Sequence, residues 1–414
     1  MRALSSIILA ASLLMVGGCA FNEKANVTYI EAVRTVSTLP NPDQTVHIFV
    51  DRNGDLYPPS KAGFTREGME ASHDHSTSED YSSLWRYANN PNHRNQVISH
   101  INQEMPAAQV CIDGTMQECW RGYQKHLKAQ TAFKLQELLS RHPCRRMVIL
   151  LHGYNNDYSD AANWYDSVSS DINRRYPGTL FVRVHWDGLG QSIPVGIWGN
   201  AQSNGPLAGV GLRYVFNWVN NRKLDRETVV ITHSTGALVA AAMLGDSSAP
   251  LPGMADVLNS KHPLPRADRF RVGLLIPAAA ANTFNNYLAT KSIGADAPSS
   301  RTPSRLVLGL NKKDGPTNKY FLSCRASGDT CMNTDARAAC RNISSAFSQV
   351  EDFENRFKIY EFSTDSTGKP NSGSLWEDHS VTSQMTRPKW GSFIDALMSD
   401  DPAPPDDSKT VCSR

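Results

Sequence analysis

The sequence predicts an α/β fold with a mostly parallel central sheet and helices on both faces. Three observations predict it: continuous apolar runs recur along the chain, amphipathic stretches separate them, and polar, turn-rich segments bound both. Apolar runs without alternation are typical of strands buried on both faces, and parallel strands need crossover connections, which are usually helical. With 414 residues, of which 40% are hydrophobic and 20% charged, the chain can bury a large core.

The elements are expected in the following order. A strand at residues 45–50 (TVHIFV) comes first, and Asn53-Gly54 after it is typical of a tight turn. A helix is expected over 120–141, where apolar residues recur on one face until His142-Pro143. The later apolar runs are 147–151, 180–184, 229–232, 272–276, 306–310 and 357–362, and helices are expected between them at 161–174, 207–220 and 237–244.

The charge balance argues against a nucleic-acid partner. Lys and Arg number 42 against 40 Asp and Glu, and the formal net charge at pH 7 is +2. The sequence has no run of basic residues interleaved with aromatic ones, as a phosphate-tracking surface would require. It also holds no motif that implies a metal or an organic cofactor.

The N-terminus has the pattern of an export signal. An apolar run at 7–16 is too short to span a bilayer and ends at small residues, so residues 1–18 are expected to be a signal peptide. The Val-Gly-Gly-Cys segment that ends at Cys19 resembles the bacterial lipobox, which implies cleavage before Cys19 and a lipid on that residue. Ala20 after it is the pattern of outer-membrane sorting, on the periplasmic side. An ordinary signal peptide with an incidental cysteine is the alternative.

One large domain is expected between an N-terminal tether and a C-terminal tail. The tether is placed at 19–43 and the domain at 44–400, with a tail at 401–414. Inside the domain, a polar stretch at about 60–106 and a cysteine-bearing stretch at about 321–345 are interpreted as insertions.

Cysteine usage agrees with an oxidising compartment. Of the eight cysteines, seven remain when Cys19 is set aside, and they are expected to pair in part. The spacings of seven and nine residues among the last three of the domain do not fit a zinc knuckle. The expected pairs are Cys111 with Cys119 and two of Cys324, Cys331 and Cys340, whereas Cys144 and Cys412 either reach across to each other or leave a free thiol.

Ser234 is the candidate nucleophile. It lies in Thr-His-Ser-Thr-Gly, directly between the apolar strand 229–232 and an Ala-rich helix. This is the strand-turn-helix context of the nucleophile elbow G-x-S-x-G, in which small residues let the helix pack close to the strand. Thr232 replaces the first glycine of that motif, and Gly236 supplies the second. The alternative is that Ser234 only caps the helix.

The loop after strand 147–151 is the candidate oxyanion loop. It reads His-Gly-Tyr-Asn-Asn, and its backbone can donate to a developing oxyanion together with the residue after the nucleophile. The expected donors are the N–H groups of Tyr154 and Thr235. His152 is expected to shape this loop, and His233 to pack against neighbouring strands.

Six segments of the sequence resemble the α/β-hydrolase superfamily, particularly the bacterial esterase- or lipase-like hydrolases of unknown function. The resemblance covers about residues 145–390 and implies an α/β-hydrolase fold with a Ser, acid, His order along the chain. Its segments are LLHGYNN at 150–156, VHWDG at 184–188, ITHSTGA at 231–237, LLIPAAAANTF at 274–284, LGLNKKDGPTNKY at 308–320 and EDHS at 377–380.

That order selects the acid and the base. The acid follows strand 306–310, where Asp314 lies, and the base follows strand 357–362. Past Ser234 the chain holds only His262 and His379, and His262 comes too early, so His379 is the expected base. Asp365 and Asp378 are rivals to Asp314 as the acid.

Two further segments are expected to have supporting roles. The resemblance makes Asp187 a residue that lines the site or fixes a loop. The Gly-rich stretch 188–209 is either a mobile lid or acyl-binding wall, or an ordinary surface loop.

These residues together indicate hydrolysis of carboxylic esters through an acyl-enzyme on the nucleophile. The expected substrates are small-molecule or lipid esters, among them acylated components of the envelope. The alternatives are acyl transfer by the same residues and a noncatalytic envelope lipoprotein that uses the fold as a binding module.

Overall fold

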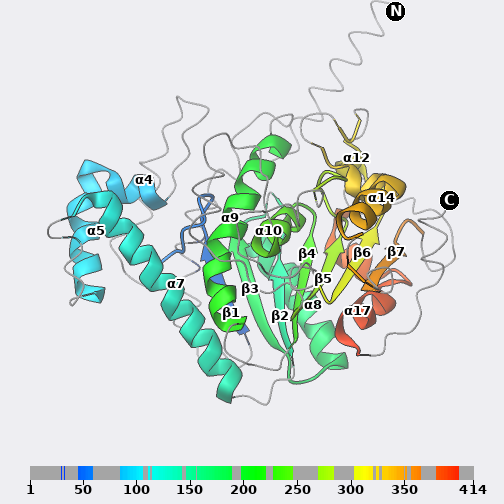
Figure 1. Cartoon of the computed structure of the whole chain (residues 1–414), viewed down its shortest axis with the longest axis horizontal. Helices are drawn as coiled ribbons and strands as arrows, with labels where there is room; N and C mark the ends of the chain where they lie inside the picture. Colours follow the sequence, from blue (N-terminus) through cyan, green and yellow to red (C-terminus); the bar gives the residue numbers. More distant parts are fainter. Residues whose placement is uncertain are drawn as a thin grey trace, which may run out of the picture.

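The computed structural model confirms an all-parallel sheet at the centre of the molecule (Figure 1). Each strand begins and ends within two residues of the apolar run that predicted it. The structure describes residues 29, 32, 45–58, 84–105, 111, 114–141, 146–154, 156–188, 197–220, 227–245, 269–283, 303–319, 323–325, 329–348, 350–351, 356–364 and 379–400.

Within those residues, seven strands pair in the order β1-β3-β2-β4-β5-β6-β7, and each pair is parallel. Most strand residues are buried, as expected for a sheet covered on both faces. The strands are β1 (Thr45–Val50), β2 (Arg146–Leu151), β3 (Leu180–Trp186), β4 (Glu227–His233), β5 (Phe270–Leu275), β6 (Arg305–Leu310) and β7 (Phe357–Glu361).

The strand order reverses at β2 and β4, which are neighbours in the sheet. From β2 the chain turns to β3 on one side, whereas from β4 it turns to β5 on the other. The connecting helices leave toward opposite faces, because α8 packs in one apolar cluster and α10 in the other. A crevice at the carboxyl ends of such a pair of strands is the usual site of function in open α/β sheets.

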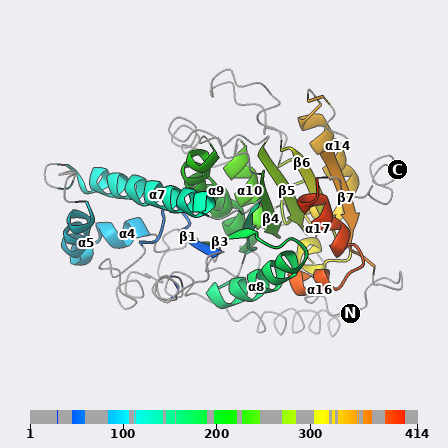
Figure 2. The same ribbon diagram turned by 90° about the horizontal axis from the view of Figure 1, so that it is seen from below.

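Helices form a layer on each face of the sheet (Figure 2). On one face lie α7 (Met116–Arg141), α9 (Ile197–Asn220), α10 (Gly236–Leu244) and α14 (Ala336–Ala346). On the other face lie α8 (Tyr158–Arg175), α16 (Val381–Met385) and α17 (Trp390–Met398). Two short helices, α12 (Gly315–Asn318) and α13 (Cys331–Thr334), follow β6.

The helix α9 begins ten residues earlier than its apolar pattern predicted. Residues 197–209 therefore belong to a helix, and the expectation of a lid or loop over that part is wrong; residues 189–196 lie outside the described part. Gly and Pro206 disfavour a helix by themselves, but close packing outweighs this. A Cβ at Gly209 would lie 2.4 Å from the Val239 carbonyl oxygen, so α9 and α10 touch backbone to backbone.

A buried arginine closes the far end of α10. The Arg213 guanidinium, which has no exposed surface, donates to the carbonyl oxygens of Ala242 at 2.7 Å and of Gly245 at 2.6 Å. A cation at a helix C-terminus is favoured by the helix dipole, and it satisfies carbonyls that lack intrahelical partners.

The helix α17 is fixed to the sheet by close packing and by arginines. A Cβ at Gly273 of β5 would lie 2.5 Å from Leu397 Cδ1, so the absence of a side chain there lets α17 approach. Arg271 and Arg305 donate to carbonyl oxygens at the end of the helix, including that of Ser399 at 2.6 and 2.9 Å.

Beside β1, an arm of helices extends the face that α7 covers (Figure 1). It contains α4 (Leu84–Asn89) and α5 (Pro91–Glu104), which lie in the stretch that the sequence presented only as a polar insertion. Few apolar residues mark them, since only Val97 and Ile101 of α5 are buried. Asp51, at the turn after β1, accepts the Leu84 N–H at 3.0 Å and so ties α4 to the sheet edge.

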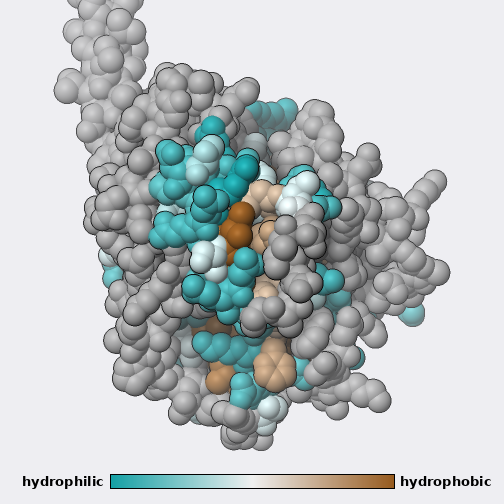
Figure 3. Space-filling view, turned by 90° about the vertical axis from the view of Figure 1, so that its left-hand side faces the viewer, coloured by the Kyte–Doolittle hydropathy of each residue, from teal (hydrophilic) through white to brown (hydrophobic). Residues whose placement is uncertain are grey.

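The outer side of this arm is mostly hydrophilic, with small hydrophobic spots (Figure 3). Among the described residues, Phe133 is a large hydrophobic side chain that is exposed, at 58%. Within that same part of the chain, no helix combines the length and the apolar character that crossing a bilayer would require. The expected signal peptide and Cys19 lie outside the described residues.

Candidate active site

Ser234 lies in a strained turn at the carboxyl end of β4. Its φ is +54°, which L-residues adopt only when the surrounding structure holds them there. Two glycines make the turn possible: a Cβ at Gly236 would lie 2.6 Å from the Leu151 carbonyl oxygen, and one at Gly153 would lie 2.8 Å from Ser234 Cβ. The elbow geometry therefore holds even though Thr232 replaces the first glycine of the motif.

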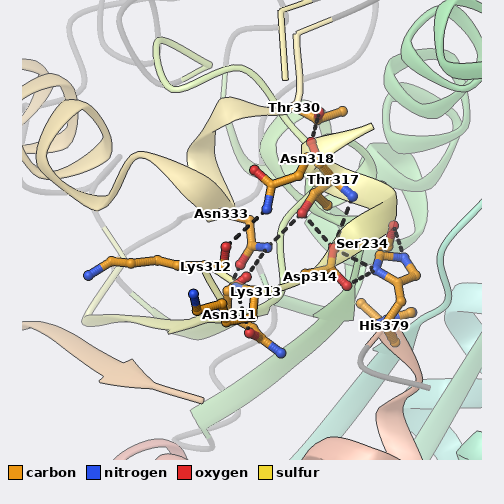
Figure 4. A network of polar contacts seen from close by, with 11 residues as sticks. Ser234, Asn311, Lys312, Lys313, Asp314, Thr317, Asn318, Thr330, Asn333 and His379 are labelled. Carbon is orange, nitrogen blue, oxygen red and sulfur yellow. Dashed lines mark hydrogen bonds and ion pairs between the residues drawn. The ribbon is translucent and has the colours of Figure 1, made fainter. Parts of the chain in front are cut away.

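Ser234, His379 and Asp314 form one hydrogen-bonded chain (Figure 4). His379 Nε2 lies 3.0 Å from Ser234 Oγ, and His379 Nδ1 lies 3.0 and 3.1 Å from the two carboxylate oxygens of Asp314. Ser234 follows β4, Asp314 lies in the loop after β6, and His379 lies just before α16. The structure thus brings together the serine, the histidine and the carboxylate that the sequence selected.

Asp314 is fully buried and holds its charge there. Burial alone raises the pKa of this carboxyl, but the charge of His379 and hydrogen bonds from His379 and Thr317 outweigh it and lower the pKa below its usual value. A buried carboxylate that stays ionised can fix the tautomer of the imidazole and stabilise its protonated form.

Asp314 also caps the helix α12. Its Oδ2 accepts the Thr317 backbone N–H at 3.0 Å and the Thr317 hydroxyl at 2.5 Å, and Pro316 occupies the first turn. An Asp at the N-cap with a Pro in the first turn is a helix-start pattern. The sequence therefore carries a local signal for the contact between Asp314 and Thr317.

His233 contacts the backbone of His379, the expected base. Its Nε2–H donates to the backbone carbonyl oxygen of His379 at 2.6 Å, and the two rings lie 4.8 Å apart. Burial, and then the charge of His379, lower the pKa of His233 to about 3, so the ring is neutral and serves as a donor. Packing was the role expected from the sequence, and the bond to His379 is an additional one that crosses 146 residues.

His152 shapes the loop after β2, as expected. Its Nε2 accepts the Trp186 N–H at 3.0 Å, which leaves Nδ1–H to donate to the Gly153 carbonyl oxygen at 2.6 Å. Burial lowers the pKa of His152 to about 4, so this ring is neutral as well. Tyr165 also holds His152 in place, since its hydroxyl oxygen accepts the backbone N–H of His152 at 3.0 Å.

The two expected oxyanion donors belong to the segments next to Ser234. Tyr154 follows Gly153, whose Cα faces Ser234, and Asn156 Nδ2 holds the Tyr154 carbonyl at 2.9 Å. Thr235 precedes the first residue of α10, where backbone N–H groups have no partner inside the helix. Their role in stabilising an oxyanion stays a prediction.

Asp187 fixes a loop. It is fully buried, its Oδ2 accepts from Arg52 Nε at 3.0 Å and Nη2 at 2.9 Å, and its N–H donates to the Val50 carbonyl at 3.0 Å. These bonds join the ends of β1 and β3. The rival acids Asp365 and Asp378 lie outside the described residues, as does His262.

The cysteines pair largely as expected. The structure contains the disulfides Cys111–Cys119 and Cys324–Cys331, and Cys340 is disulfide-bonded too. Cys144 and Cys412 are outside the described part of the chain. Within that part, no group of three or more His, Cys, Asp or Glu side chains is arranged to hold a metal ion.

The central part of the chain is similar to a known protein family. Residues 127–249 match the model of a family described as an alpha/beta hydrolase of unknown function (DUF900). The matched segment contains the loop after β2, β3, β4 and the turn of Ser234, and it ends before Asp314 and His379. Among curated proteins, none matches the chain. Together with the all-parallel sheet, the family match confirms the α/β-hydrolase fold and the resemblance on which the triad order was based.

Proposed function

The chain has the fold of the α/β hydrolases, and we propose that it is a serine hydrolase that cleaves carboxylic esters through an acyl-enzyme on Ser234. The observation that carries this proposal is the chain of hydrogen bonds from Asp314 through His379 to Ser234, with distances of 3.0 Å at both links. A nucleophile within reach of a base, itself oriented by a third group, is the geometric signature of nucleophilic catalysis.

The proposed reaction has two halves. Ser234 Oγ attacks the ester carbonyl carbon while His379 Nε2 takes the serine proton, and the resulting imidazolium then gives that proton to the departing alcohol. A water molecule next attacks the acyl-enzyme, His379 accepts its proton, and the carboxylic acid leaves as Ser234 recovers the proton. Asp314 remains ionised throughout and stabilises the imidazolium.

The oxyanion of each tetrahedral intermediate is assigned to the backbone N–H groups of Tyr154 and Thr235. The contact of Gly153 with Ser234 supports this assignment, because it brings the loop after β2 directly against the nucleophile. Donors that are fixed before the reaction stabilise the developing charge without reorganisation.

Labelling with a fluorophosphonate probe tests the proposal, because such probes react with activated serines. Wild type is expected to form one adduct, located on Ser234 by peptide mass, and to hydrolyse p-nitrophenyl acetate. Ser234→Ala should lose both, whereas Ser170→Ala, an exposed serine on α8, should retain both. An unlabelled wild type, or equal labelling of Ser234→Ala, would refute the serine-hydrolase proposal.

The cellular location of the protein is a second part of the proposal. The lipobox resemblance at Cys19 supports a lipid anchor in the cell envelope, where lipid esters and acylated envelope components are at hand. Metabolic labelling with a palmitate analogue should mark the full chain and should not mark Cys19→Ala. Labelling of both would show that the lipid is attached at another residue.

A further inference from the structure

The helix α13, in the cysteine-bearing stretch after β6, places a fully buried amide beside the proposed acid (Figure 4). From its contacts we infer that Asn333 is a positioning residue for Asp314, a role that rests on the proposed function. Asn333 acts through Thr317, and no atom of it is required to touch the substrate.

The Asn333 amide joins both ends of the loop that carries Asp314. At the start of the loop, Asn333 Oδ1 accepts the Asn311 N–H at 2.8 Å and Nδ2 donates to the Asn311 carbonyl oxygen at 2.9 Å. At its end, Nδ2 donates to Thr317 Oγ1 at 2.8 Å. One side chain thus sets the separation between the residue after β6 and the helix that Asp314 caps.

The bond from Asn333 also fixes the direction of the Thr317 hydroxyl. Since Nδ2 can only donate, Thr317 Oγ1 accepts there, and its own proton points to Asp314 Oδ2 at 2.5 Å. With the Thr317 N–H at 3.0 Å, that carboxylate oxygen receives two donors besides the ring of His379. These donors favour the ionised carboxylate and define its plane relative to the imidazole.

The disulfide-closed segment in turn holds Asn333. The Cys324–Cys331 bond ends at the first residue of α13, and Thr330 Oγ1 donates to the Thr317 carbonyl oxygen at 2.7 Å. In addition, the Met332 N–H donates to the carbonyl oxygen of Ala279, which follows β5, at 3.0 Å. The segment interpreted as an insertion therefore supports the acid.

A double-mutant cycle tests the inference. Asn333→Ala should lower kcat for p-nitrophenyl acetate about tenfold, the order expected for a hydrogen bond that serves a charged group, with KM unchanged. In a Thr317→Val background the same change should cost less than about twofold in kcat, because the relay through Thr317 is already broken. The control is Asn318→Ala, whose amide bonds only to the Lys312 carbonyl among the contacts drawn in Figure 4 and should leave kcat unchanged.

A second variant covers the case in which Asn333→Ala does not fold. Asn333→Asp keeps the shape of the side chain and the acceptor for the Asn311 N–H, but its ionised form cannot donate to Thr317, so kcat should fall as in the alanine variant. Wild-type kcat in either folded variant, or a loss that adds fully to that of Thr317→Val, overturns the inference. If wild type itself neither labels nor turns over, the proposed function fails and these comparisons are not reached.

Discussion

The two disulfides that the structure describes offer a matched pair of perturbations. Cys111–Cys119 and Cys324–Cys331 span 8 and 7 residues, so the chain-entropy model assigns both nearly the same stabilisation, about 2.5 kcal/mol each. Cys111–Cys119 lies at the start of α7 in the arm, whereas Cys324–Cys331 ends at α13, beside Asn333. Their effects on stability should therefore match, and their effects on activity should not.

Replacing each pair by two serines separates the two effects. Denaturant unfolding under non-reducing conditions, at equal protein concentration, should give free energies of unfolding about 2.5 kcal/mol below wild type for both double variants. At 25 °C and without denaturant, kcat for p-nitrophenyl acetate should fall about tenfold only in Cys324→Ser/Cys331→Ser, because loss of the crosslink frees Asn333 and Thr330 from Thr317.

Equal kcat in the two double variants would refute the reasoning, since it would mean that the Cys324–Cys331 segment contributes stability alone. An activity loss confined to Cys111→Ser/Cys119→Ser would refute it as well. Adding Asn333→Ala to the Cys324→Ser/Cys331→Ser background should then change kcat little, because both changes act on the same contact.

Three other outcomes follow from the site and its surroundings. Asp314→Asn should lower kcat by about 10³- to 10⁴-fold, since an amide favours the wrong imidazole tautomer, while Asp365→Asn assayed beside it should stay near wild type; the reverse ranking would reassign the acid. Gly236→Ala should abolish fluorophosphonate labelling, because its Cβ would lie 2.6 and 2.7 Å from the Leu151 and His152 carbonyl oxygens; normal labelling would show that the elbow tolerates a side chain. Burial lowers the pKa of His47 and His152 to about 4 and that of His233 to about 3, while unfolded chains bind these protons below about pH 6.5. As the pH is lowered, the unfolded state thus binds protons before the folded state does. The free energy of unfolding should therefore decrease as the pH falls from about 6.5 to about 4, by up to about 1.4 kcal/mol per pH unit for each ring; a urea midpoint that does not change over that range would contradict this.

The sequence predicted the sheet well, because its strands are buried on both faces and so appear as uninterrupted apolar runs. Ser234 could be chosen because it lies at the junction between such a run and a helix. His379 could be chosen because only two histidines, His262 and His379, follow Ser234 in the sequence. Asp314 was harder to choose, since several carboxylates lie in the same region of the sequence. Its burial and its contact with His379 are products of tertiary structure.

Other features had weak local signals. The start of α9 is rich in Gly and contains Pro206, so propensity argued for a loop, and only the backbone contact with α10 explains the helix. The helix α4 is only six residues long, and α5 buries only Val97 and Ile101, so neither shows a long apolar pattern in the sequence. Asn333 and His233 contact partners that lie 16 to 146 residues away along the chain, and nothing in the residues next to them indicates those bonds.

The distance along the chain between the proposed nucleophile and its proposed base has a consequence for the order of folding. His379 lies 145 residues after Ser234, in the same terminal stretch as α17, whose Leu397 packs on Gly273 of β5. Contacts between residues so far apart close a long loop and therefore tend to form late. A chain that has assembled its sheet and its elbow but has not yet docked α17 is expected to be compact and inactive. Catalytic competence would then appear only when α17 docks. The appearance of the proposed esterase activity during refolding, compared with the earlier recovery of helical signal, would time that step directly.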